Sequence, residues 1–314
     1  MEYFTGGTVF RLKSIRSGIH FSSMPPAKKL TDQETGAYLE AGRIAKRIKA
    51  DFPAEVKEGK RYLDFVEELE GEIIAEGCKP AFPCNIGINE VGAHYTPTPS
   101  DSSEFSSGDL VKVDFGLHLD GYIVDTAFSV ALSSVDQKLV NAVSQSLRAV
   151  VQGLKVGDRV SEVGRLVDAI SQKQGFKVIE NLQGHEIRRY VLHAGLSIPN
   201  VPNMDNRRFS DGMVVAIEPF MTYDFGGGKV RESATTTIYK APNGGREPIA
   251  SALRDFHGLP ICERWMGKVG SGVTKRELEK LKKYPVLVEE RGAPIAQAET
   301  TLLFHSGRVT DLVS

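Results

Sequence analysis

The centre of the fold is predicted by one stretch, residues 110–132, LVKVDFGLHLDGYIVDTAFSVAL. Apolar residues dominate segments 110–117 and 122–132, and both segments are bounded by turn residues, which favours two β-strands. Between them lies Asp120-Gly121, a pair that is common in two-residue hairpin turns. The stretch therefore predicts a β-hairpin.

Two acids, Asp114 and Asp125, interrupt these apolar strands. A turn at 119–120 would place Asp114 opposite Asp125. A turn at 120–121 would place Asp125 opposite Gly116, with Asp114 as its diagonal neighbour. Both registers put the carboxylates on one face, where like charges repel and are costly to desolvate. The pair indicates either a divalent cation or a solvated face of the hairpin.

Outward from the hairpin, helical and strand signals alternate. Helix–helix–strand order occurs twice, over 31–132 and 134–222, which predicts an α+β fold with a pseudo-duplicated core. The expected helices are Thr31–Lys49 with a capping box at Thr31 and Glu34, 61–76, Val135–Gly153 with a cap from Ser134 and Gln137, and Val160–Gln174. The remaining expected elements are a Pro- and Gly-rich loop over Pro80–Ser107 and strands at Gly212–Ile217, Ser233–Lys240 and Ala298–Phe304.

The ends and the later part of the chain differ from this core. Residues 1–30 form a basic leader, either an unstructured extension or a segment with the composition of a transit peptide. Segments 31–244 and 291–314 are expected to form the core. Segment 245–290 is charged, carries a capping box at Thr274 and Glu277, and is expected to be a small helical insert.

Bulk properties exclude several classes of protein. The formal net charge is −1, which gives no overall attraction to nucleic acid or to a membrane surface. No apolar run approaches the roughly 20 residues of a transmembrane helix. The three cysteines form no Cys-x-x-Cys pair, so we expect a reducing, cytoplasmic environment and no structural zinc site made of thiolates.

Further candidate ligands follow the hairpin. His185 and His193 each lie near a glycine, Glu218 ends an apolar strand before Pro219, and Glu299 stands alone in another such strand. Glutamate is seldom fully buried unless it is paired. Four carboxylates and one imidazole suit Mn, Co, Fe or Zn, and such a set leaves room for a water molecule that two metals would activate.

These residues resemble the pita-bread metallopeptidases, and more closely the type 2 methionine aminopeptidases in their archaeal-like form. The resemblance covers about residues 31–314. It rests on KPAFP from Lys79, NEVGAHYTP from Asn89, VDFG from Val113, NLQGH ending at His185, HAG from His193, AIE ending at Glu218, AQAE ending at Glu299, and an insert containing Arg264-Trp265.

The resemblance implies a pita-bread fold and two divalent metal ions. Asp125 and Glu299 would bridge the metals, Asp114 would chelate one of them, and His185 and Glu218 would hold the other. A hydroxide between the metals would attack the first peptide bond of nascent proteins that begin with methionine.

Further roles are implied for residues around the metals. Glu218 would act as the general base, His193 would stabilise the charge on the scissile carbonyl oxygen, and His94 would assist near the substrate amine. The pocket for methionine would be lined by Phe82, Leu192 and Tyr284.

Two alternatives remain open at this stage. One is an Xaa-Pro peptidase of the same fold, and the other is a non-catalytic relative that binds RNA or ribosomes. We expect a cytoplasmic monomer in transient contact with the ribosome, without a specific nucleic-acid or membrane partner. The family usually has Phe-Glu-His-Thr around the last ligand, where this chain has Ala298-Glu299-Thr300-Thr301; this difference could loosen the contacts that orient Glu299.

Overall fold

The computed structural model describes residues 29–243, 248–268 and 272–313. Its centre is the predicted hairpin, formed by β4 (Leu110–Leu119) and β5 (Tyr122–Ala131). The turn residues Asp120 and Gly121 have φ angles of 49° and 87°, the left-handed conformation that a tight hairpin turn requires. Gly116 lies opposite Asp125, so the second of the two registers is correct and both acids share one face.

The four long helices expected from the sequence are all present, and the structure adds several short strands that the sequence did not predict. The helices are α1 (Asp32–Asp51), α2 (Tyr62–Ala75), α3 (Gln137–Gly153), α4 (Ser161–Gln174), α5 (Pro248–Ala252), α6 (Glu263–Lys268) and α7 (Lys275–Leu278), with 3-10 turns η1 (Phe52–Glu55) and η2 (Arg254–Phe256). The strands are β1 (Lys79–Pro80), β2 (Asn85–Ile88), β3 (Val91–Ala93), β6 (Phe176–Val178), β7 (Gly184–Ile187), β8 (Ser197–Ile198), β9 (Val214–Ile217), β10 (Phe220–Tyr223), β11 (Val230–Lys240), β12 (Pro260–Cys262), β13 (Lys282–Glu289), β14 (Ile295–Gln297), β15 (Thr300–His305) and β16 (Arg308–Asp311).

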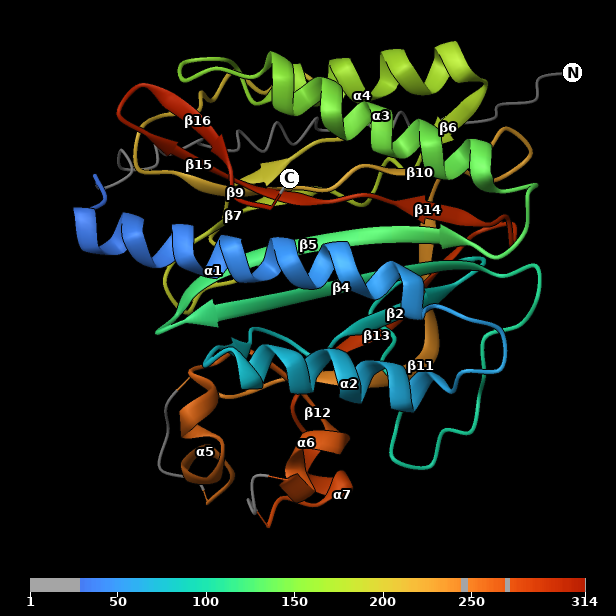
Figure 1. Ribbon diagram of the computed structural model, residues 1–314, viewed down its shortest axis with the longest axis vertical. Coiled ribbons are helices and arrows are strands. Elements are labelled where there is room, and N and C mark those ends of the chain that lie inside the picture. The colour runs from blue at the N-terminus through green and yellow to red at the C-terminus, as the bar shows by residue number, and fades with distance from the viewer. Residues whose placement is uncertain (1–28, 244–247, 269–271, 314) are drawn as a thin grey trace, which may run out of the picture.

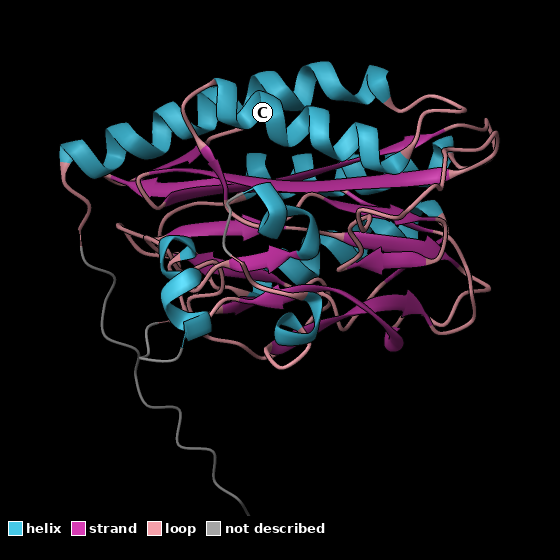
Figure 2. Ribbon diagram, turned by 90° about the horizontal axis from the view of Figure 1, so that it is seen from below, coloured by secondary structure: helices cyan, strands magenta, loops and turns pink. Residues whose placement is uncertain are grey.

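These strands form four antiparallel sheets that the long helices cover. The sheet orders are β1-β4-β2 with β5 on β4, β14-β10-β6, β12-β11-β13-β3, and β16-β15-β9-β7-β8. Helix α1 packs on β4 and β5, and α3 packs on α4 and on β10 and β14. Figure 1 shows α3 and α4 at the opposite end of the molecule from α5, α6 and α7, and Figure 2 shows the longer helices gathered on one side of the strands.

Helix starts follow the predicted caps in two cases out of three. The capping boxes at Thr31 and at Thr274 are both present. The predicted cap from Ser134 is wrong, because Asp136 is the N-cap of α3 and no side chain caps that helix. The Asp136 carboxylate instead accepts a hydrogen bond from the Tyr223 hydroxyl at 2.6 Å and another from Ser133.

The structure also corrects two segment predictions. The expected loop 80–107 contains β2 and β3, which pair with β4 and β13. In the described residues of the expected helical insert 245–290, helix is confined to α5, α6, α7 and the 3-10 turn η2, because β12 and β13 both pair with β11. Backbone pairing with β11 therefore decided the conformation of a segment whose charged side chains suggested helix. None of the helices in the described ranges combines the length and apolar character that crossing a lipid bilayer demands.

Most of the basic leader predicted over 1–30 lies outside the described residues.

Candidate metal centre and active site

The five predicted metal ligands meet in one cavity of about 350 Å³. They come from five different places in the chain, namely Asp114 on β4, Asp125 on β5, His185 on β7, Glu218 directly after β9, and Glu299 between β14 and β15. Each position follows from strand pairing, since β7 pairs with β9 and the backbone of Glu299 bridges to Ala127 on β5.

The donor atoms lie close enough to share a cation. The Nε2 atom of His185 is 3.5 Å from the Oδ2 atom of Asp125 and 3.6 Å from the Oε1 atom of Glu218. One donor atom from each of Asp125, His185 and Glu299 falls within 4.8 Å of the others. These three residues are buried.

Burial shifts the pKa of every candidate ligand in the direction that favours the neutral form of the side chain. Burial and the neighbouring Asp125 raise the pKa of Asp114 and of Glu299, and burial raises the pKa of Asp125 to about 8. The pKa of Glu218 is raised by burial, then by Asp125 and Asp114. Burial lowers the pKa of His185 to about 4, which keeps its imidazole neutral and able to bind a metal.

These observations fit a divalent metal site. Within the described part of the chain, Asp114 Oδ1 and Asp125 Oδ1 are buried without a hydrogen-bond partner. Buried carboxylate oxygens are costly to leave unpaired, and a cation would compensate several of them at once. Carboxylate oxygens with one imidazole nitrogen are typical ligands of Mn, Fe, Co and Zn. The face of the hairpin that carries the two acids lines the cavity, with Asp125 buried and Asp114 partly buried, which favours the cation over the solvated face that was the other sequence hypothesis.

The five other predicted site residues line the same cavity. These are His94, His193, Phe82, Leu192 and Tyr284. The His193 ring lies 4.3 Å from the His185 ring, centroid to centroid, and the His94 ring lies 5.4 Å from that of Tyr284. The Nδ1 atom of His94 is 3.1 Å from the Pro285 carbonyl oxygen. Because a carbonyl only accepts, Nδ1 carries the proton, and Nε2 is left as an acceptor.

Two glycines let the walls of the cavity approach each other. A Cβ atom on Gly116 would lie 2.4 Å from Cε1 of Phe82, so only glycine allows this ring to lie across β4. A Cβ atom on Gly184 would lie 2.3 Å from the backbone oxygen of Ala216, which holds β7 and its His185 close to β9.

Sequence reasoning missed the residues that hold Glu299. The Nζ atom of Lys49, at the end of α1, donates to the Glu299 carbonyl oxygen at 2.7 Å and to the Thr126 hydroxyl at 2.9 Å. The Thr126 hydroxyl donates to the same carbonyl at 2.8 Å. The side-chain amide of Gln297 donates to Oε2 of Glu299 at 3.3 Å. The sequence feature that could have indicated this contact is the position of Lys49, which directly follows Ile48 at the end of the apolar stripe of the first helix.

The unusual neighbours of Glu299 have ordered contacts of their own. The Thr301 hydroxyl accepts from the Asp125 amide at 2.8 Å and donates to the Asp125 carbonyl at 2.7 Å. Thr300 donates to Asp311, and Ala298 packs in the apolar core. Thr301, which the family pattern shares, therefore joins β15 to the ligand strand β5, and the two substituted neighbours of Glu299 have partners of their own.

Comparison with known proteins places this chain in a family. The model of metallopeptidase family M24 matches residues 36–241. The methionine aminopeptidase of Pyrococcus abyssi (strain GE5 / Orsay) is 38% identical over 287 residues, which are 86% of this chain and 96% of the relative.

Solved structures share the fold at low sequence identity. A thermophilic Arx1 has a TM-score of 0.75 at 15% identity, covering 90% of this chain and 91% of that one. The methionine aminopeptidase from Rickettsia prowazekii has a TM-score of 0.69 at 17% identity, covering 92% and 100%. These structures confirm the pita-bread fold, and the metallopeptidase family agrees with the buried acidic cluster. The chain therefore belongs to metallopeptidase family M24 and, within it, to the type 2 methionine aminopeptidases.

Proposed function

We propose that the protein removes the N-terminal methionine from nascent proteins with the help of two divalent metal ions. The observation that carries this proposal is a single cavity that joins five metal-ligating side chains to an apolar wall. The acids and His185 supply the chemistry, and the apolar side chains supply a place for the first residue of a peptide.

We assign the five ligands as the sequence motifs imply. Asp125 and Glu299 would bridge the two ions, Asp114 would bind one, and His185 and Glu218 would bind the other. When bound, the ions would activate a water molecule and polarise the scissile carbonyl. Co, Mn, Fe and Zn all suit these donors.

Three side chains would move or stabilise charge during the reaction. Glu218, whose Oε1 atom lies 3.6 Å from Nε2 of His185, would accept the proton of the attacking water as general base. His193 would donate to the oxygen on which negative charge develops. His94 would use its free Nε2 atom as an acceptor for the amino group of the substrate.

The apolar wall would select the first side chain. Phe82, Leu192 and Tyr284 line the cavity, and Ile238 and Leu287 extend the wall. A linear thioether adapts well to such an irregular apolar space.

The test is hydrolysis of short peptides by the metal-free protein supplied in turn with Mn, Co, Fe or Zn. Release of methionine from Met-Ala and Met-Gly peptides would support the proposal. No release with any of the four ions, from protein that is folded by circular dichroism, would refute it. Preferential cleavage of Xaa-Pro peptides would assign the protein to the proline-specific branch instead.

We also propose a cytoplasmic enzyme that meets its substrates at the ribosome. Cys78, Cys84 and Cys262 are all buried and free, which suits a reducing compartment. Co-sedimentation with ribosomes at low salt would support a transient association. An unchanged sedimentation profile in the presence of translating ribosomes would contradict it.

A further inference from the structure

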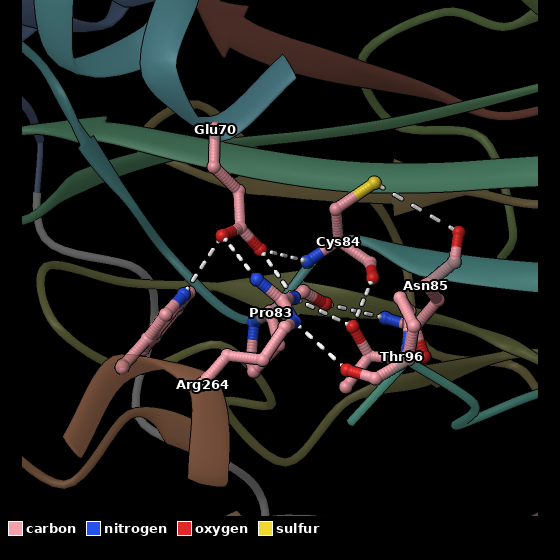
Figure 3. Close-up of polar contacts among 8 residues, drawn as sticks. Glu70, Pro83, Cys84, Asn85, Thr96 and Arg264 are labelled. Atoms are coloured by element: carbon pink, nitrogen blue, oxygen red, sulfur yellow. Dashed lines mark hydrogen bonds and ion pairs between the residues drawn. The ribbon is translucent and has the colours of Figure 1, made fainter. Parts of the chain in front are cut away.

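The insert is joined to the core by a buried polar cluster, in which Glu70 on α2 faces Arg264 on α6 (Figure 3). Trp265 on α6 is the third member of this cluster. The guanidinium of Arg264 donates through Nη1 to Oε2 of Glu70 at 2.8 Å and through Nη2 to Oε1 at 2.9 Å. The Trp265 indole donates to the same carboxylate at 2.8 Å. The side chains of Arg264 and Glu70 are only 1% and 6% exposed.

This cluster also holds two loops by their backbone. The amide of Cys84 donates to Oε1 of Glu70 at 3.1 Å. Arg264 donates to the Pro97 carbonyl and to the Thr96 hydroxyl, both at 2.8 Å. That hydroxyl in turn donates to the Cys84 carbonyl at 2.7 Å, which closes a ring of hydrogen bonds around the pair.

The two loops carry residues that line the catalytic cavity. Phe82 lies two residues before Cys84, and Asn85 directly after it, while His94 lies two residues before Thr96. All three line the cavity. Each backbone group held by the cluster is therefore within three residues of the cavity wall.

We infer that Glu70, Arg264 and Trp265 are positioning residues through which the insert sets the shape of the side-chain pocket. This inference rests on the proposed function, because it concerns the pocket that would accept methionine. A buried ion pair usually adds little net stability over apolar residues of similar size. In this ion pair, the remaining donors and acceptors form hydrogen bonds with the Cys84 amide, the Thr96 hydroxyl and the Pro97 carbonyl. Such an arrangement is expected of residues that support a pocket.

The test removes the cluster while keeping a filled core. The double variant Glu70→Met with Arg264→Met replaces the ion pair by apolar side chains, a change that proteins often tolerate. Arg264→Lys keeps the positive charge but not the planar set of donors. The control is Glu263→Gln, which alters the neighbouring residue of α6 and its exposed ion pair with Lys275.

The diagnostic quantity is the ratio of kcat/KM for Met-Ala over Leu-Ala peptides. A variant that merely contains less folded protein loses both activities equally, so its ratio stays constant. Misplacement of the wall at Phe82 should lower the ratio at least about tenfold, mainly through a higher KM for the methionine peptide. Glu263→Gln should leave the ratio unchanged.

An unchanged ratio in a folded double variant would overturn the inference. If the double variant does not fold, the ratio for Arg264→Lys decides the matter by the same criterion. Trp265 is the only tryptophan of the chain, so its fluorescence reports directly whether the cluster has opened.

Binding of free methionine and free leucine, measured by calorimetry, separates the inference from the proposed function. A wild-type protein that releases no methionine refutes the proposed function. The ratio of the two affinities then still tests the positioning role, and equal ratios in wild type and variants would refute that role alone.

Discussion

Replacement of Asp125 by Asn should abolish metal-linked stabilisation without weakening the metal-free fold. Asp125 is buried beside His185, and its charge raises the pKa of Asp114, Glu218 and Glu299. Asparagine has the same shape and no charge, so it relieves this repulsion. The metal-free variant should therefore melt at the same temperature as the wild type or at a higher one.

The size of the metal effect follows from mass action. At a metal concentration of 100 times Kd, a site present only in the folded protein adds about 2.7 kcal/mol. An unfolding entropy of about 2.1 cal/mol/K per residue amounts to about 0.65 kcal/mol/K for 314 residues. Metal should then raise the wild-type Tm by about 4 °C, and the Asp125→Asn variant by less than about 1 °C.

The assay is differential scanning calorimetry of chelator-treated protein with and without Mn or Co. Asp120→Asn is the matched control, because Asp120 lies in the turn of the same hairpin, pairs with Arg189 at the surface and is not among the residues that line the cavity. The Asp120→Asn variant should show the same metal-induced increase in Tm as the wild type. If metal raised the Tm of the Asp125→Asn variant as much as that of the wild type, the assignment of this cluster as the metal site would be refuted.

Two further variants test the remaining parts of the site, and a third tests the pH dependence of stability. Gly116→Ala should displace the Phe82 ring, because the added Cβ atom would lie 2.4 Å from it. The variant should bind the same amount of metal and show a KM for Met-Ala peptides that is about tenfold higher. An unchanged KM would contradict the role of Phe82. His193→Ala should lower kcat about 10²- to 10³-fold while bound metal, measured by plasma mass spectrometry, stays constant; metal loss would argue against oxyanion stabilisation. Burial lowers the pKa of His118 from 6.5 to about 4. As the pH falls, His118 is therefore protonated in the unfolded chain at a higher pH than in the folded protein. The free energy of unfolding should fall by up to about 3 kcal/mol as the pH drops from 6.5 toward 4. His118→Asn should flatten that slope in urea titrations at pH 4.5 and 7, and an identical slope would rule out His118 as its source.

The site was largely predictable because its residues carry local signals. An acid in an apolar strand, such as Asp114 or Asp125, is conspicuous whatever the rest of the fold. Strand periodicity then put both acids on one face in either register. The roles of the ten residues in the cavity stay predictions until the variants are measured.

The contacts that support the site could not be predicted in the same way. Glu70 and Arg264 are 194 positions apart, and nothing near either residue indicates its partner. Lys49 resembles any charged residue at the end of a helix until α1 is packed on β5. Residues 282–289 become a strand only because β11 and β3 offer backbone groups on both sides.

The position of β13 has a consequence for how the chain folds during synthesis. Leu287 of β13 pairs with Ala93 of β3, so β3 gains this neighbour only after about 190 further residues have been made. At about 5–20 residues per second, that delay lasts roughly 10 to 40 seconds. During this time β3 lacks its partner and the Glu70 carboxylate lacks Arg264. The catalytic cavity thus stays incomplete until β13 and Glu299 have been made, so activity can begin only after the ribosome has passed this part of the chain.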